Sequence, residues 1–362
     1  MLADFPCRIY INSSIVNRGL LASSALPPDS SSASPSIRHA ITSRFELLAR
    51  DYPPSTSTMP PPRGTPNLLE GPGDYDVTTV VHSSSYPAIS PLTSPTHAGK
   101  SVFIAGASRG IGLAIAVSFA QAGSSQIAIG ARSDLTSLKQ TLLDAATKAG
   151  RPEPEILCIK LDITSQSSTE EAAKLVEKAF GKLDIVINNA GILRKPALIA
   201  DSDPDAWWET WNVNLRGPYL ITRAFLPLLL KGGDKTIITT SSVGAHLISP
   251  TLSAYQPSKL AVLRFMQFVA KEYESQGVLT YTIHPGNVVT DMLEDAFDVS
   301  AELRALFTET PEISADTLTF LTREKRDWLA GRYINVTWDM PELMSKENEI
   351  VKGDKLKVKL DF

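Results

Sequence analysis

The sequence is poor in cysteine, and this scarcity argues against one class of fold. Cys7 and Cys158 are the only cysteines in 362 residues, and they lie in very different contexts. A disulfide framework is therefore not supported, and a reducing compartment is the default expectation. No apolar run approaches the roughly 18 residues of a membrane-spanning helix, so we expect no membrane span. The five histidines show no metal-ligand spacing, and we expect no metal site.

The chain also lacks an excess of positive charge. Its formal net charge is −4, which gives no reason to expect a nucleic-acid partner. Hydrophobic residues make up 43% of the chain and charged residues 20%, as is typical of a globular protein. The length allows either one large domain with additional segments or two domains.

Residues 1–98 show no sustained hydrophobic period. More than half of the 25 prolines lie there, together with clusters of serine. We therefore expect a low-complexity extension that is largely disordered or draped over another domain. Residues 1–58 contain arginine but no lysine, which is compatible with a mitochondrial transit segment. The alternatives are a disordered extension or a true start at Met59, and we expect a cytoplasmic protein unless the segment is a genuine signal.

From Lys100 onward, short apolar runs alternate with longer amphipathic ones. Such alternation predicts right-handed crossovers and a parallel sheet that is covered on both faces. The fold class is therefore α/β, a doubly wound Rossmann-type sheet of about seven strands in a single domain over residues 99–345, followed by a tail at 346–362. The clearest strands are expected at 101–105, 126–130, 156–161, 184–188, 236–240 and 279–284, with long helices at 205–230 and 253–276.

A glycine-rich turn follows the first expected strand, with the spacing Gly-x-x-x-Gly-x-Gly. Glycines at this place permit a tight turn and let the backbone approach a pyrophosphate at the start of a helix. Such a turn taken alone could be structural, but its position in a strand–helix–strand unit predicts dinucleotide binding. The candidate residues of this turn are Gly106, Ser108, Arg109, Gly110, Ile111 and Gly112.

The second expected strand ends without an acidic residue. An acid there would bind the ribose 2′-hydroxyl and repel a 2′-phosphate. Instead Arg132 and Ser133 follow the strand, and Arg132 can meet Arg109 at a phosphate as a charge-assisted donor. We therefore predict NADP(H) as the cofactor. The alternative is that both arginines are solvated surface groups, and Asp134 lies nearby.

Two further strand ends carry candidate cofactor contacts. Asp162 follows the third strand, where its carboxylate could accept a hydrogen bond from the adenine amine or could cap the next helix. Asn189, Ala190 and Gly191 close the fourth strand. An asparagine there can tie neighbouring strands together, and the small residues let the backbone approach the cofactor ribose.

Tyr255 and Lys259 lie four residues apart at the start of a strongly patterned helix, so both side chains can reach one pocket. Alone, this pair is weak evidence. Together with the glycine turn, Asn188 to Gly191, Ser241-Ser242 and the Pro285-Gly286-x-Val288-x-Thr290 motif, it resembles the short-chain dehydrogenase/reductase family over roughly residues 100–339. The likeness is to members from filamentous fungi. One departure is Ala105, where the family commonly has threonine.

The resemblance implies a role for each catalytic candidate. Tyr255 is the general acid or base, and Lys259 lowers the tyrosine pKa and binds the nicotinamide ribose. Ser242 hydrogen-bonds the substrate carbonyl oxygen, and Asn214 positions a water that relays protons to Lys259. Pro285, Gly286, Val288 and Thr290 lie beside the expected nicotinamide, where backbone groups and the threonine hydroxyl can bind its carboxamide.

The resemblance also implies a substrate lid at about 290–312. Its apolar residues suggest a medium-sized apolar ketone or aldehyde, reduced with NADP(H), or the corresponding alcohol in reverse. An ordinary surface helix is the alternative for this segment, and a catalytically silent dinucleotide-binding regulatory protein is the alternative for the function. Family members commonly pair their long helices, so we expect a homodimer or homotetramer through helices that carry Trp207, Trp208 and Trp211. Burial of these tryptophans under the N-terminal segment is the other possibility.

Overall fold

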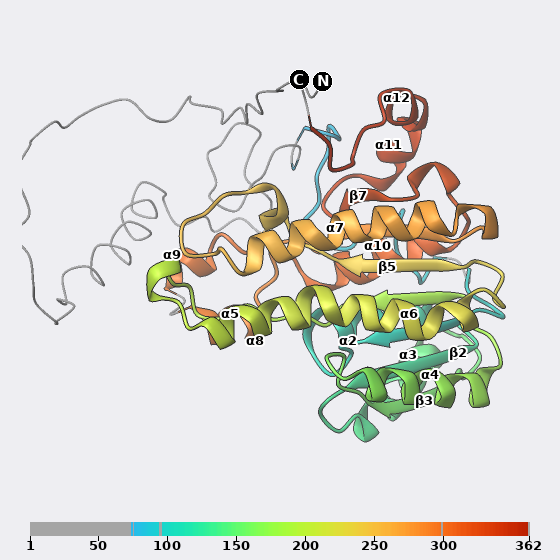
Figure 1. The fold of residues 1–362 in the computed structure, drawn as a ribbon. Coiled ribbons are helices and arrows are strands. Elements are labelled where there is room, and N and C mark those ends of the chain that lie inside the picture. The colour runs from blue at the N-terminus through green and yellow to red at the C-terminus, as the bar shows by residue number, and fades with distance from the viewer. Residues whose placement is uncertain (1–73, 75, 94–95, 298–299, 361–362) are drawn as a thin grey trace, which may run out of the picture. The chain divides into compact units, whose positions relative to one another are not determined.

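A computed structural model describes residues 74, 76–93, 96–297 and 300–360, without the side chains of residues 302 and 303. The expectations for residues 1–58 lie outside the described residues. The described chain forms a seven-stranded sheet in the order β3-β2-β1-β4-β5-β6-β7, and every neighbouring pair is parallel (Figure 1). The predicted doubly wound parallel sheet is confirmed. Its strands are β1 (Ser101–Ala105), β2 (Gln126–Ala131), β3 (Glu155–Lys160), β4 (Ile185–Asn188), β5 (Thr236–Thr240), β6 (Leu279–His284) and β7 (Arg332–Asn335).

Helices cover both faces of the sheet and divide the core into two parts. Successive side chains of a strand point to opposite faces. Val102 and Ile104 of β1 therefore join the core under α2, α3 and α10, whereas Phe103 joins the core under α4, α6 and α7. The helices are α2 (Gly110–Gln121), α3 (Thr136–Lys148), α4 (Gln166–Phe180), α5 (Pro204–Trp211), α6 (Gly217–Leu229), α7 (Tyr255–Glu272), α8 (Asp291–Ala296), α9 (Ala301–Arg304), α10 (Pro311–Thr322), α11 (Met340–Ser345) and α12 (Glu347–Lys352).

The helix expected over 205–230 is interrupted. A π-helical segment, Asn212–Arg216, separates α5 from α6. Such segments widen the helix by one residue and are common at functional sites. Here the segment carries Asn214, whose side chain bonds the backbone of Ile192 on a neighbouring loop. The structure thus corrects the expectation of one continuous helix, and the correction falls on a predicted site residue.

Two segments, one before β1 and one near the C-terminus, pair with β7 and with the residues that directly follow it. The His82 amide donates to the Thr337 carbonyl (2.7 Å), and Val81 forms an antiparallel bridge with Trp338. On the other side the Tyr333 amide donates to the Leu356 carbonyl (2.8 Å). These contacts satisfy backbone groups that an edge strand would otherwise expose. In the described part of the chain, no helix is both long and apolar enough to cross a membrane.

Candidate active site

A cleft of about 750 Å³ opens at the carboxyl ends of the strands. This is the edge at which parallel α/β sheets bind their ligands, beside the point where strand order reverses between β1 and β4. Gly112 and Asn214 are the two predicted site residues that do not line it. Those that do are Gly106, Ser108, Arg109, Gly110, Ile111, Arg132, Ser133, Asp162, Asn189, Ala190, Gly191, Ser242, Tyr255, Lys259, Pro285, Gly286, Val288 and Thr290.

Gly112 packs directly against the backbone of the glycine turn. A Cβ atom at this position would lie 1.9 Å from the Gly106 carbonyl oxygen and 2.6 Å from the Asn189 amide nitrogen. That same Asn189 nitrogen donates to the Gly106 carbonyl (3.0 Å). Gly106 itself has φ +83°, a conformation that favours glycine. The turn is therefore fixed by close packing between β1, α2 and the end of β4.

Gly112→Ala is expected to destabilise the protein by about 2 kcal/mol or more, because the new methyl group would displace the backbone of the turn. Dinucleotide affinity should fall with it. Chemical denaturation and a binding titration measure both effects. Gly233→Ala is the matched control, since a Cβ there would meet its nearest atom, the Asp184 Oδ1, at 3.5 Å. Equal stability of the two variants would contradict this account of the turn.

Tyr255 and Lys259 lie one turn apart at the start of α7. The Lys259 ammonium is 5.6 Å from the centre of the Tyr255 ring and donates to the Thr240 carbonyl at the end of β5 (3.0 Å). Ser242 is hydrogen-bonded to Tyr255, and its Oγ accepts from the Gly244 amide (3.0 Å). The Ser241 hydroxyl fixes this arrangement by donating to the Lys259 carbonyl (2.8 Å). Phenol, hydroxyl and ammonium thus share one wall of the cleft.

Burial dominates the protonation of this pair. It raises the pKa of Tyr255, and the hydrogen bond with Ser242 opposes the change. It lowers the pKa of Lys259 to about 8. A low-dielectric setting disfavours the charged form of each group. The ammonium is directed to the Thr240 carbonyl. That Lys259 lowers the pKa of Tyr255 stays a prediction.

Lys259→Met is expected to increase stability at neutral pH, because the folded protein no longer has to bury an ammonium whose pKa falls from 10.5 to about 8. That shift corresponds to roughly 3 kcal/mol. The gain in unfolding free energy of the variant over the wild type is largest at pH values below 8 and disappears as the pH approaches 10.5. Unfolding free energies of variant and wild type across this range measure it. The exposed Lys352→Met is the control, and a gap that does not narrow with rising pH would refute the prediction.

Asn214 is buried behind the wall of the cleft that Tyr255, Ser242 and Lys259 form, in the π-helical segment. Its side chain accepts from the Ile192 amide and donates to the Ile192 carbonyl (both 2.9 Å), and it also donates to the Ser258 hydroxyl (3.2 Å). A Cβ on Gly191 would lie 3.3 Å from both the Asn214 oxygen and the Lys259 nitrogen. The two side chains therefore approach the same point from different helices.

Two arginines, Arg109 and Arg132, line the cleft at the loops after β1 and β2, and three acids lie near them in the sequence or the fold. Arg109 pairs with Asp291 (2.7 Å), and both side chains are more than half exposed. Asp134 is held locally by the Thr136 amide (3.0 Å) and hydroxyl (2.6 Å). Asp162 accepts from the Thr164 hydroxyl and amide. That hydroxyl bond is the main cause of its lowered pKa, and the charge of Arg132 adds to it.

Sequence reasoning missed several groups at the site. Thr240 acts through its backbone carbonyl, for which the residue type gives no signal. Glu209 also lines the cleft and pairs with Arg194. Glu309 is buried against the turn that contains Gly286, although glutamate is rarely buried. Its position just before the Pro311 helix start was the only available hint. The apolar lining at the far end comes from Ile192, Leu193, Val213, Val289, Met292, Leu293 and Phe307.

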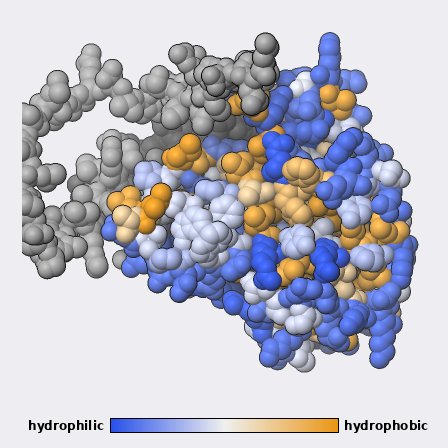
Figure 2. Space-filling view, viewed as in Figure 1, coloured by the Kyte–Doolittle hydropathy of each residue, from blue (hydrophilic) through white to orange (hydrophobic). Residues whose placement is uncertain are grey.

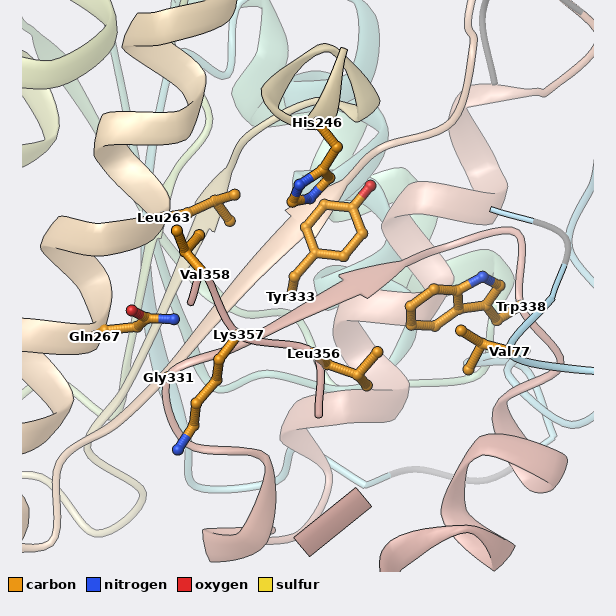
Figure 3. Close-up of a pocket in the computed structure, with 10 residues that line it drawn as sticks. All are labelled: Val77, His246, Leu263, Gln267, Gly331, Tyr333, Trp338, Leu356, Lys357 and Val358. Atoms are coloured by element: carbon orange, nitrogen blue, oxygen red, sulfur yellow. The ribbon is translucent and has the colours of Figure 1, made fainter. Parts of the chain in front are cut away.

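A second cavity, of about 110 Å³, shares no lining residue with the cleft at the carboxyl ends of the strands (Figure 3). It lies between α7, β7 and the C-terminal segment. The ring of His246 meets Tyr333 edge-on, with 4.7 Å between ring centres. Its lining is mostly apolar and includes no predicted site residue.

The chain is similar to known proteins along most of its described length. A family model described as short chain dehydrogenase matches residues 100–300. The chain is 56% identical over 304 residues to the short chain dehydrogenase pigC of Monascus ruber, covering 84% of this chain and 100% of that one. It is 51% identical over 279 residues to the short chain dehydrogenase citE of the same fungus, covering 77% and 94%. The expected likeness to fungal members is confirmed.

Solved structures give the same answer for the fold. A short-chain type dehydrogenase/reductase from Mycobacterium marinum has a TM-score of 0.59 and 26% identity, over 67% of this chain and 96% of that one. The sheet order and the cleft at its carboxyl edge agree with this likeness. Fold, motif order and relatives together show that the chain is an oxidoreductase of the short-chain dehydrogenase/reductase family.

Proposed function

We propose that the protein is an NADP(H)-dependent reductase of a medium-sized apolar ketone or aldehyde, with Tyr255 as the general acid. The observation that supports this most is the shared wall of Tyr255, Ser242 and Lys259, in one cleft with the glycine turn. The apolar residues at the far end of the cleft, from α8 and the loop after β4, favour an apolar substrate over an anionic one.

The chemistry follows from where charge develops. The bound nicotinamide supplies the hydride. Hydride addition leaves negative charge on the substrate oxygen, which the hydroxyls of Ser242 and Tyr255 stabilise as preplaced donors. Tyr255 then gives its proton to that oxygen. Lys259 holds the nicotinamide ribose in this proposal.

The preference for a 2′-phosphate rests on Arg132 and on the position of Asp134. One oxygen of the Asp134 carboxylate, Oδ1, accepts from both donors of Thr136, and Asp134 does not line the cleft. Arg132 is exposed at the rim of the cleft and is close enough to Asp162 to lower its pKa. An exposed guanidinium at this position suits a phosphate dianion.

The test is an NADPH-oxidation screen over ketones, aldehydes, quinones and steroids, combined with a binding titration. Turnover of at least one apolar carbonyl compound with NADPH is the expected result. Tight binding of NADPH without turnover of any compound would instead favour the silent regulatory protein. Absence of binding to both NADPH and NADH would end the proposal.

We also propose a homodimer or homotetramer formed through α5, α6 and α7. Hydrophobic residues, orange in Figure 2, are interspersed with paler and blue residues on this face. Two large exposed side chains of these helices are Trp208 of α5, which is 61% exposed, and Phe268 of α7, which is 57% exposed. Such large exposed side chains on neighbouring helices are typical of an interface. Light scattering should give a mass of two or four times 39.2 kDa, and a monomer would refute the proposal.

A further inference from the structure

The turn after β6 is held by two buried polar side chains from a later part of the chain. The Glu309 carboxylate accepts from the Asn287 amide (2.7 Å). The Ser314 hydroxyl donates to the Pro285 carbonyl (2.6 Å). Glu309 is 6% exposed and Ser314 is fully buried. Hydrogen bonds therefore hold the turn on both sides of Gly286, at the Pro285 carbonyl before it and at the Asn287 amide after it.

The two side-chain contacts restrain a turn whose backbone can adopt several shapes. Gly286 has φ +82°, and glycine adopts many backbone conformations at low cost. Residue 286 has no room for a side chain, because a Cβ there would lie 3.0 Å from both the Cβ and the Cγ of Glu309. The backbones also meet, in a parallel bridge between Val288 and Glu309.

Glu309 is itself supported from both directions. The Thr308 hydroxyl donates to its second carboxylate oxygen (2.9 Å). The next amide along the chain, that of Thr310, donates to the Ser83 carbonyl (2.8 Å). Burial raises the pKa of Glu309 to about 6, so the group is charged at neutral pH and its bond to Asn287 is charge-assisted. Burying a carboxylate lowers the stability of the fold. We therefore attribute the role of Glu309 to the position in which it holds Asn287 rather than to stabilisation of the fold.

We propose that Glu309 and Ser314 are positioning residues that hold the 285–288 turn in the shape that meets the nicotinamide end of the bound cofactor. The inference rests on the proposed function, because it assumes that a nicotinamide dinucleotide occupies this cleft. Gly286, Asn287 and Val288 line the cleft, whereas Glu309 acts only through them. Neither Glu309 nor Ser314 reaches the adenosine end, which is formed by the loops after β1 and β2.

The experiment compares two ligands that share one half. Adenosine 2′,5′-bisphosphate carries the adenosine part of NADPH, including its 2′-phosphate, but no nicotinamide. Glu309→Ala should weaken NADPH binding by about tenfold, the effect of one lost charge-assisted hydrogen bond. Binding of the bisphosphate should stay within about twofold of wild type, because the hydrogen bonds of Glu309 go to Asn287 and Thr308 and not to the loops after β1 and β2. A residue that merely stabilised the fold would affect both ligands alike.

Three further variants make the test decisive. Glu309→Gln keeps an oxygen that can accept from Asn287 and should restore NADPH binding to near wild type. Ser314→Ala should likewise weaken binding of NADPH but not of the bisphosphate. This variant tests the inference if Glu309→Ala does not fold. Glu312→Gln, on the exposed side of α10, is the control and should change nothing. Equal effects on both ligands, or no effect on NADPH in folded variants, would overturn the inference. Failure of the wild type to bind either nicotinamide cofactor would overturn the proposed function as well.

Discussion

Tyr255→Phe is expected to lower kcat/KM for carbonyl reduction by about a thousandfold while NADPH binding remains near wild type. The change removes one oxygen, and with it both the proton that completes the alcohol and a donor to the developing oxyanion. The ring still fills its place at the start of α7, and Lys259 keeps its bond to the Thr240 carbonyl, so the cofactor site is preserved. Steady-state kinetics and a fluorescence titration of NADPH separate the two quantities.

Tyr219→Phe is the matched control for this prediction. Tyr219 lies on the outer face of α6, is 46% exposed and contacts the Phe265 ring rather than the cleft. Its variant should keep full activity. Turnover of Tyr255→Phe within a few fold of wild type would sink the mechanism. Loss of NADPH binding in that variant would mean that the phenol serves the cofactor more than the reaction.

Replacing both Arg132 and Arg109 with alanine is expected to reduce the preference for NADPH over NADH by about a hundredfold. Each guanidinium can make charge-assisted hydrogen bonds to a 2′-phosphate, and NADH has no such phosphate to lose. Arg132→Ala alone should reduce the preference for NADPH more than Arg109→Ala alone, because Arg109 already pairs with Asp291 (2.7 Å). The ratio of kcat/KM for the two cofactors measures the preference and cancels general effects on catalysis.

The control for the arginines is Arg223→Ala on α6. Arg223 pairs with Glu170 of α4 on the surface, away from the cleft, and its loss should leave the ratio unchanged. A double variant that keeps the wild-type preference would show that the arginines are solvated surface groups. A wild type that prefers NADH would overturn the cofactor assignment before any substitution is made.

The sheet was predictable because its strands are buried on both faces. Runs such as residues 101–105 are apolar at nearly every position, and their shortness and the turn residues that bound them favour buried strands over helices. The glycine turn and the Tyr255–Lys259 spacing were visible for a similar reason. Backbone approach to a phosphate requires glycine, and a shared helix face requires a separation of three or four residues.

Other parts of the site were not accessible to the same reasoning. The π-helical segment around Asn214 arises from contacts with the loop at Ile192, which lies 22 residues earlier, and the local pattern there remains helical. The hydrogen bond between Glu309 and Asn287 also joins residues 22 positions apart. A glutamate that precedes a helix gives no sign in the sequence that it is buried. The pKa of Tyr255 follows from desolvation, a property of the assembled cleft rather than of a motif.

The covered edge of β7 has a consequence for how the chain folds. His82 reaches Asp339 across a separation of 257 residues, and the sheet cannot be closed on that side until β7 has been synthesised. Contacts so distant in sequence carry a large loop-closure entropy and slow the search for the native state. The segment at 76–86 is made early but finds its partners last. It must therefore stay unpaired through most of synthesis, when exposed strand-forming segments are most prone to associate with other chains.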